Sequence, residues 1–200
     1  MAEIKSTMDM VMERAARIAG EHTAVELSDD VLKEGMRAGA AYMRGDENDL
    51  AVRVAAHPEA QRFEFIKGVA KSLLRSVFLP RDDEQLQSAE NAMNGMVQLS
   101  DGNRELLSVF GDLKKILEQY MQHRVQAKEQ LESAFAQQMA QMEGALAQQT
   151  GMSMKLKPSQ HPKFQEEWQR LLDDLNGQYG KVVDQHKQLV ENFLTNPQRK

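Results

Sequence analysis

The chain has 200 residues, no cysteine and a formal net charge of −5, so we expect one or two small domains and exclude disulfides, zinc–thiolate sites and iron–sulfur clusters. Ala, Glu, Lys, Leu, Arg, Gln and Met occupy 117 positions, whereas Val, Ile and Thr occupy only 21. Because the first set loses little side-chain freedom in a helix and the second is typical of strands, the composition predicts an all-α fold.

The first hundred residues predict a small bundle of five short helices. The first begins near Ala2, and the second has Ser28 as its N-cap and ends at Gly45, because glycine adopts the left-handed C-cap geometry without steric cost. Gly35 and Gly39 lie four residues apart inside this second helix. Since each interior glycine weakens a helix by about 1 kcal/mol, this pair predicts a close crossing with another helix.

Prolines separate the next predicted helices. A short helix opens at Asp46-Glu47 and stops at His57, since Pro58 disfavours helical geometry in the residue before it. The helix after Pro58 runs to Leu79-Pro80 and forms the centre of the expected N-terminal core, and a fifth helix covers residues 82–99. The inward positions expected on these two helices are Phe63, Ile66, Val69 or Ala70, Leu73, Leu74, Val77, Phe78, Leu86, Ala89, Met93, Met96 and Val97.

The segment from Arg104 to Thr150 contains no proline and keeps apolar residues at near-helical spacing. One continuous helix over this segment would extend for about 70 Å at 1.5 Å per residue. Two helices broken near Gly111 are the alternative, and the sequence leaves both open. The expected inward positions are Leu106, Phe110, Leu113, Leu117, Met121, Val125, Leu131, Phe135, Met139, Met142 and Leu146.

Gly151 ends this helical segment, and a loop near residues 151–163 leads to a last helix from Lys163 to about Leu194. Because two long helices joined by one loop run antiparallel, residues 101–200 predict a long, coiled-coil-like antiparallel helical hairpin. Residues 1–100 form the other predicted domain. The apolar stripe expected on the last helix contains Phe164, Trp168, Leu171, Leu175, Tyr179, Val182, His186, Leu189 and Phe193.

Motifs that carry catalysis or cofactor binding are absent from the sequence. No histidine has a glutamate three residues before it, as helical di-iron sites require, and the glycine-rich phosphate loops and the serine-nucleophile elbow are missing. We therefore assign no catalytic residue, no cofactor and no metal site. The alternative is a metal-binding or enzymatic helical bundle with a site in the N-terminal helices, using His22 or His57 with nearby acids.

Methionines gather around the predicted tip of the hairpin, where we place the candidate partner-binding residues. Methionine is flexible and polarizable, which suits an adaptable binding surface, although filling irregular gaps in a core is the more common reason for methionines. Nine glutamines between residues 119 and 149 are compatible with a contact face or with a solvated one. The candidate residues are Met139, Met142, Met152, Met154, Lys155 and Lys157.

A long amphipathic hairpin without converging polar residues favours recognition of proteins over small-molecule pockets. We therefore expect a non-enzymatic protein–protein interaction module, acting as a scaffold, an adaptor or a chaperone-like protein, that also forms homo-oligomers through leftover apolar edges. Lys155, Lys157 and Lys163 are the only local excess of positive charge, too sparse for us to expect nucleic-acid binding. The acidic start and the lack of an apolar span predict a cytoplasmic protein without membrane insertion.

Three segments resemble an uncharacterised family of helical bacterial proteins. They are Met-Ala-Glu-Ile-Lys-Ser-Thr-Met-Asp-Met-Val-Met-Glu-Arg (residues 1–14), Leu79-Pro80, and His161-Pro162-Lys163-Phe164 at the entry to the last helix. The resemblance implies a cytoplasmic bacterial setting and an all-helical fold. It implies no activity and no site, because the family has none assigned.

Overall fold

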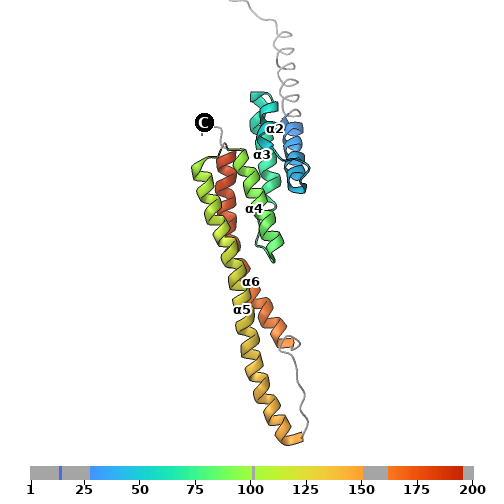
Figure 1. Ribbon diagram of the computed structural model, residues 1–200, viewed down its shortest axis with the longest axis vertical. Helices are drawn as coiled ribbons and strands as arrows, with labels where there is room; N and C mark the ends of the chain where they lie inside the picture. The colour runs from blue at the N-terminus through green and yellow to red at the C-terminus, as the bar shows by residue number, and fades with distance from the viewer. Residues whose placement is uncertain (1–13, 15–27, 101, 151–161, 196–200) are drawn as a thin grey trace, which may run out of the picture. The chain divides into compact units, whose positions relative to one another are not determined.

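The computed structural model describes residues 14, 28–100, 102–150 and 162–195, and these ranges are helical apart from short connections (Figure 1). A helix over residues 28–44 is followed by α2 (Leu50–Ala56), α3 (Glu59–Leu74), α4 (Asp83–Gln98), α5 (Arg104–Thr150) and α6 (Pro162–Leu194). No strand occurs in these ranges, so the all-α prediction is confirmed. The predicted first helix lies almost entirely outside them.

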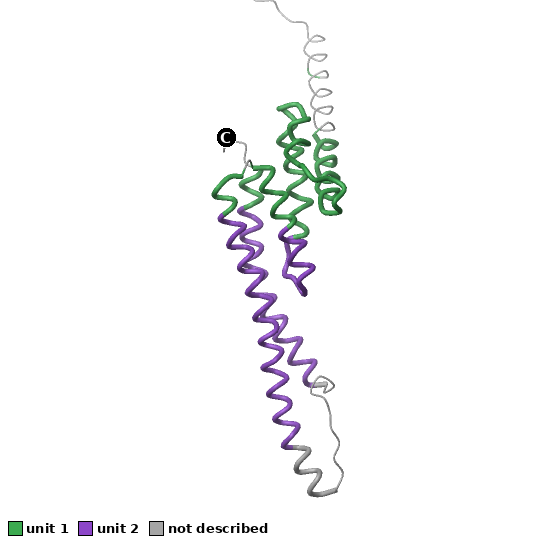
Figure 2. The backbone as a smooth tube through the Cα atoms, in the orientation of Figure 1, with its two compact units in different colours: residues 1–76, 91–107, 190–200 green, residues 77–90, 108–189 purple. Residues whose placement is uncertain are grey.

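The chain divides into two compact units, each assembled from separated segments (Figure 2). Unit 1 comprises residues 1–76, 91–107 and 190–200, and unit 2 comprises residues 77–90 and 108–189. Both units therefore draw on both of the segments that the sequence predicts as domains.

A close helix crossing lies within unit 1. A Cβ atom at Gly35 would collide with the backbone carbonyl oxygen of Phe65, and one at Gly68 would collide with that of Leu32. A Cβ atom at Gly39 would also press against α3. Only glycine allows two helix backbones to approach this closely, so the crossing predicted from the glycine pair is confirmed.

The core of unit 1 is centred on α3, as predicted, and Val69, Ala70, Leu73 and Leu74 of the predicted face are buried. Phe65 is completely buried and stacks against His57 with 4.2 Å between ring centroids, whereas Phe63 and Ile66 of the predicted face are only half-buried. Leu50 of α2 is completely buried as well. The predicted face of α3 is therefore confirmed in the second half of the helix and wrong in the first half, where Phe65 is buried in place of Phe63 and Ile66.

Two predicted helix starts are wrong. The short helix α2 begins at Leu50 and not at Asp46-Glu47, because Asp49 is its N-cap and accepts a hydrogen bond from the Val52 N–H. Ser28 already belongs to a helix and so is not its N-cap. The predicted end of that helix is confirmed, because Gly45 follows it with a φ of 81°, in the left-handed region.

The helix α3 ends at Leu74, five residues before the predicted end at Leu79. Within the non-helical residues that follow, Val77 is completely buried, and its carbonyl oxygen accepts a hydrogen bond from Lys187 of α6. Phe78, predicted to face inward, is 43% exposed. The chain leaves helical geometry here because residues 77–82 pack along the long helices of unit 2.

The helices α5 and α6 form an antiparallel pair in unit 2. The Tyr120 hydroxyl donates to Asn176 Oδ1 at 2.7 Å, and the ring of Phe135 meets that of Phe164 with 5.5 Å between centroids. Because higher residue numbers on α5 meet lower ones on α6, the predicted hairpin is confirmed. The helix α5 continues unbroken through Gly111 over 47 residues, so the alternative of two shorter helices is wrong.

The buried stripe of α6 is displaced from the predicted one in the second half of the helix. Val182 and Leu189 of the predicted stripe are 37% and 56% exposed, whereas the neighbouring Val183 and Val190 are buried. In unit 2, Val183 lines the groove that the 77–82 segment forms with α5 and α6. Val125 of α5, also predicted to face inward, is 56% exposed.

Candidate functional site

A groove of ≈ 590 Å³ lies in unit 2, where residues 77–82 run along α5 and α6. One side of α6 lines it with residues from Gln169 to Lys187 that, apart from the adjacent Val183 and Asp184, are three or four positions apart, and α5 contributes Tyr120 and Arg124. Such spacing places the contributing side chains of a helix on one side. The groove is therefore built by three segments that are distant in the sequence.

Two cations hold the 77–82 segment in place. Arg124 Nη1 donates to the carbonyl oxygen of Arg81 at 2.8 Å, and Lys187 Nζ donates to that of Val77 at 2.9 Å. A non-helical segment has carbonyl groups without backbone partners, and these two side chains supply partners from the long helices. Each cation uses one donor in this way, and an ammonium has three and a guanidinium five.

Arg81 is fixed at its backbone and free to place its side chain. Its N–H donates to Gln85 Oε1 at 2.9 Å, while the Gln85 N–H donates to the carboxylate of Asp82 at the start of α4. The side chain of Arg81 is exposed and lines the groove. This N-terminal capping arrangement therefore fixes the backbone of Arg81, a residue that lines the groove.

The groove is richer in positive than in negative charge. Arg81, Arg124 and Lys187 line it together with a single carboxylate, that of Asp184. None of these three cations forms an ion pair within the described ranges, whereas Lys114 nearby on α5 pairs with Glu90 at 3.0 Å. That pairing raises the pKa of Lys114, first through the hydrogen bond and then through the charge of Glu90.

Uncharged polar groups connect α5 to α6 beside these cations. The Tyr120 hydroxyl uses Oδ1 of Asn176 as its acceptor, which leaves the Asn176 amide nitrogen as a donor beside the groove. Tyr179 and His123 are joined at 2.6 Å between the hydroxyl oxygen and Nδ1. The ring of Tyr179 meets that of Tyr120 edge to face, with 5.5 Å between centroids.

Of the predicted binding residues, the structure describes the side chain of Met139 alone. Met139 of α5 is only 9% exposed, as expected for a residue that packs between helices. The side chain of Met142, and the whole of Met152, Met154, Lys155 and Lys157, lie outside the described residues. A binding role at the hairpin tip therefore stays a prediction.

The environment of His57 bears on the alternative of a metal-binding bundle. His57 Nε2 lies 3.6 Å from Glu34 Oε1, and Arg53 also pairs with Glu34, at 3.4 Å. Within the ranges that the structure describes, no three His, Asp or Glu side chains are grouped so that they could hold a metal ion. His22 lies outside those ranges.

The described helices also include none with the length and apolar character needed to cross a membrane.

One protein family matches most of this chain. Its sequence model, described as a family of unknown function (DUF6657), matches residues 52–192, a range that includes every residue lining the groove. The match contains Leu79-Pro80 and the entry to α6, two of the three segments in which the sequence resembles an uncharacterised family. No curated protein and no solved structure matches the chain. The chain belongs to the family of unknown function DUF6657.

Proposed function

We propose that this chain is a non-enzymatic interaction module that binds other proteins, as a scaffold, an adaptor or a chaperone-like protein does. The observation that carries the proposal is the exposure of apolar side chains along one side of α6. We call Tyr179, Val182, His186 and Leu189 the α6 flank. Val182 and Leu189 are 37% and 56% exposed, and Tyr179 and His186 are half-buried.

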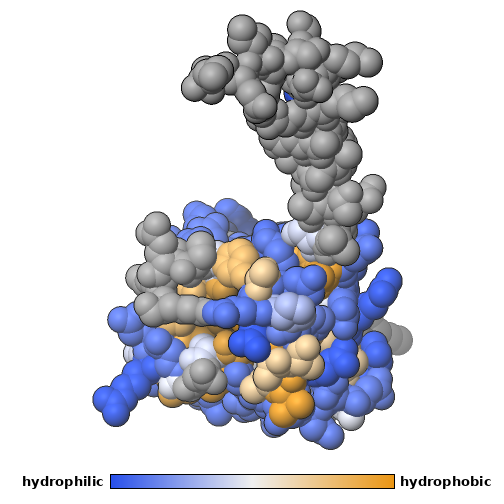
Figure 3. Space-filling model, turned by 90° about the horizontal axis from the view of Figure 1, so that it is seen from above, coloured by the Kyte–Doolittle hydropathy of each residue, from blue (hydrophilic) through white to orange (hydrophobic). Residues whose placement is uncertain are grey.

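The spacing of the α6 flank suits contact with another helix. Its members follow one another at steps of three and four, so they lie on one side of α6. A partner helix with apolar residues at the same spacing would bury them, and each buried CH₂ group contributes about 0.8 kcal/mol. The face seen in Figure 3 carries hydrophobic side chains in several areas among hydrophilic ones.

A second copy of the chain is the first partner that we propose. Every copy presents the same α6 flank, and a twofold arrangement would pair the two flanks with each other. We further propose a cytoplasmic setting in a bacterial cell, on the resemblance noted in the sequence. We propose no enzymatic step.

Sedimentation of the full chain over a range of concentrations tests this proposal. We expect a reversible oligomer that Leu189→Glu shifts toward the monomer, because the new carboxylate would have to lose its hydration in the contact. Val125→Glu is the matched control, since Val125 is equally exposed but lies outside the flank. Capture experiments in the native cell with the same two variants as bait test whether the α6 flank binds a protein other than a second copy of the chain.

The flank is not the contact surface if wild type stays monomeric at every concentration and any captured protein binds Leu189→Glu as well as wild type. Equal effects of Leu189→Glu and Val125→Glu would also contradict the proposal. In that case the loss would follow from added charge and not from this side of α6.

A further inference from the structure

We propose that the groove between the 77–82 segment, α5 and α6 is a binding site for a small organic anion with a phosphate or carboxylate group. Neither the family assignment nor the interaction through the α6 flank implies such a site, and the proposal does not depend on that interaction. It rests on the charges, the donors and the size of the groove in unit 2.

The first argument is charge. Arg81, Arg124 and Lys187 come from three different segments and line one groove, where Asp184 is the single carboxylate. This excess of positive charge stands in a chain whose net charge is −5. Like charges gathered at one place repel one another, and an anion among them removes that repulsion.

The second argument is that hydrogen-bond donors remain available. Arg124 and Lys187 each give one hydrogen bond to a backbone carbonyl, and these bonds hold the two side chains at the groove. Their remaining N–H groups and the guanidinium of Arg81 can donate to the oxygens of an anion. Charge-assisted hydrogen bonds of this kind are shorter and about twice as strong as neutral ones.

The third argument is size, and it favours a small molecule over a polymer. The volume of ≈ 590 Å³ lies within the range of about 300–1,000 Å³ that is typical of small-molecule sites. The apolar residues Phe78 and Leu172, which are not buried, line the same groove and suit an organic body beside the charged group.

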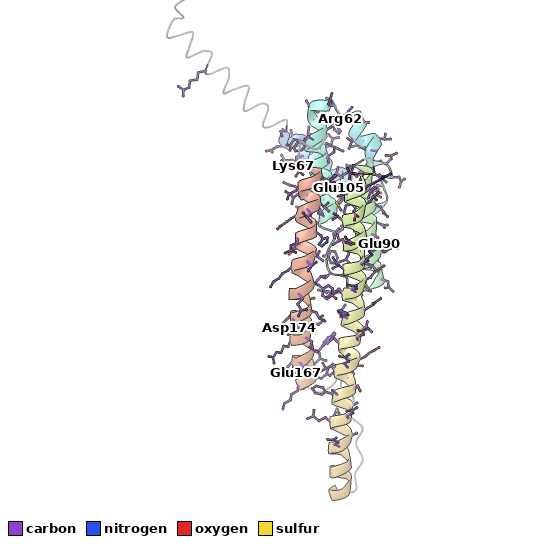
Figure 4. The ribbon with its side chains drawn as sticks, turned by 90° about the vertical axis from the view of Figure 1, so that its left-hand side faces the viewer. Arg62, Lys67, Glu90, Glu105, Glu167 and Asp174 are labelled. Atoms are coloured by element: carbon purple, nitrogen blue, oxygen red, sulfur yellow. The ribbon has the colours of Figure 1, made fainter. Side chains whose placement is uncertain are left out.

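A long polyanion fits this part of the molecule poorly. It would have to continue along α6 beyond the groove, and the exposed face of that helix carries Glu167 and Asp174 (Figure 4). Glu166 and Asp173 are exposed there as well. These carboxylates would repel the part of a polyanion that extends beyond the groove, so a short anion fits the charge distribution better.

Titration calorimetry with the full chain tests the site, using pyrophosphate and citrate as probes. We expect at least one of them to bind saturably, and Arg81→Gln to weaken that binding about tenfold or more through loss of a charge-assisted contact. Arg170→Gln is the matched control, because Arg170 is an exposed arginine of α6 that does not line the groove. Binding of pyrophosphate alone would identify a phosphate ligand, and binding of citrate alone a carboxylate ligand.

We expect Arg81→Gln to keep the fold, because the described hydrogen bonds of Arg81 are made by its backbone. Circular dichroism of both variants checks this directly. The proposal is overturned if neither probe binds at millimolar concentration, or if Arg170→Gln weakens binding as much as Arg81→Gln does. Neither result would affect the proposed contact through the α6 flank, which is measured by sedimentation.

Discussion

Lys187 of α6 donates a hydrogen bond to the carbonyl oxygen of Val77 at 2.9 Å, although the two residues are 110 positions apart in the chain. The side chain of Lys187 therefore fixes the backbone just after α3, where the polypeptide has left helical geometry. The completely buried side chain of Val77 is held by the same arrangement. This long-range contact, together with the hydrogen bond from Arg124 to Arg81, thus secures the segment that forms one wall of the groove.

Replacing Lys187 with methionine should destabilise the fold. The variant keeps most of the apolar stem but leaves the Val77 carbonyl without this donor, so we expect a loss of about 1–3 kcal/mol in the free energy of unfolding. Urea denaturation measures it. Lys181→Met is the control, because Lys181 is exposed on α6 and should change stability by less than about 0.5 kcal/mol. Equal stability of the two variants would contradict this role of Lys187.

The glycine crossing in unit 1 predicts opposite effects for two alanine substitutions. Gly68→Ala would force a methyl group against the carbonyl oxygen of Leu32, so we expect a loss of about 2 kcal/mol or more. Gly177→Ala in α6 meets no described atom within 4 Å and should gain about 0.5–1 kcal/mol, since alanine favours helix. Thermal unfolding shows whether each of the two substitutions destabilises or stabilises the fold. A stabilising Gly68→Ala would mean that the two helices do not cross closely.

The raised pKa of Tyr42 predicts that the fold becomes less stable at alkaline pH. Burial raises the pKa of Tyr42 above its ordinary value of 10.0, because the charged form loses hydration. Its stabilising contribution is therefore complete below pH 10 and is lost as the pH rises through the folded-state pKa. Absorbance at alkaline pH should show a tyrosine that ionises late in wild type, is absent in Tyr42→Phe, and disappears in urea. Identical titrations of wild type and Tyr42→Phe would contradict this assignment.

The long helices and the glycine crossing could be predicted from the sequence because their signals are local. The segment 104–150 contains no proline, and Gly35 and Gly39 are costly in a helix unless another backbone lies close. The start of α2 could not be predicted in the same way. Asp46 and Asp49 are both suitable caps, and tertiary packing selects Asp49, since Leu50 is buried and its N–H donates to the side chain of Gln98.

The groove gave no recognisable signal in the sequence. Arg81, Arg124 and Lys187 are separated by dozens of residues, and each is unremarkable among its neighbours. They meet because α5 and α6 are antiparallel and because α3 ends at Leu74, which the sequence placed later. A prediction of this site would have required the path of residues 77–82, and tertiary contacts determine that path.

The displaced stripe of α6 gives the sharpest test of how this helix packs. Val190 is completely buried, and its predicted-inward neighbour Leu189 is 56% exposed. Val190→Ala should therefore cost about 2 kcal/mol through the cavity that it leaves, although it removes fewer atoms than Leu189→Ala. Leu189→Ala should cost less than about 0.5 kcal/mol, as is usual for an exposed position. Urea denaturation measures the loss of unfolding free energy in each variant. A greater loss for Leu189→Ala would show that α6 buries the stripe predicted from its periodicity.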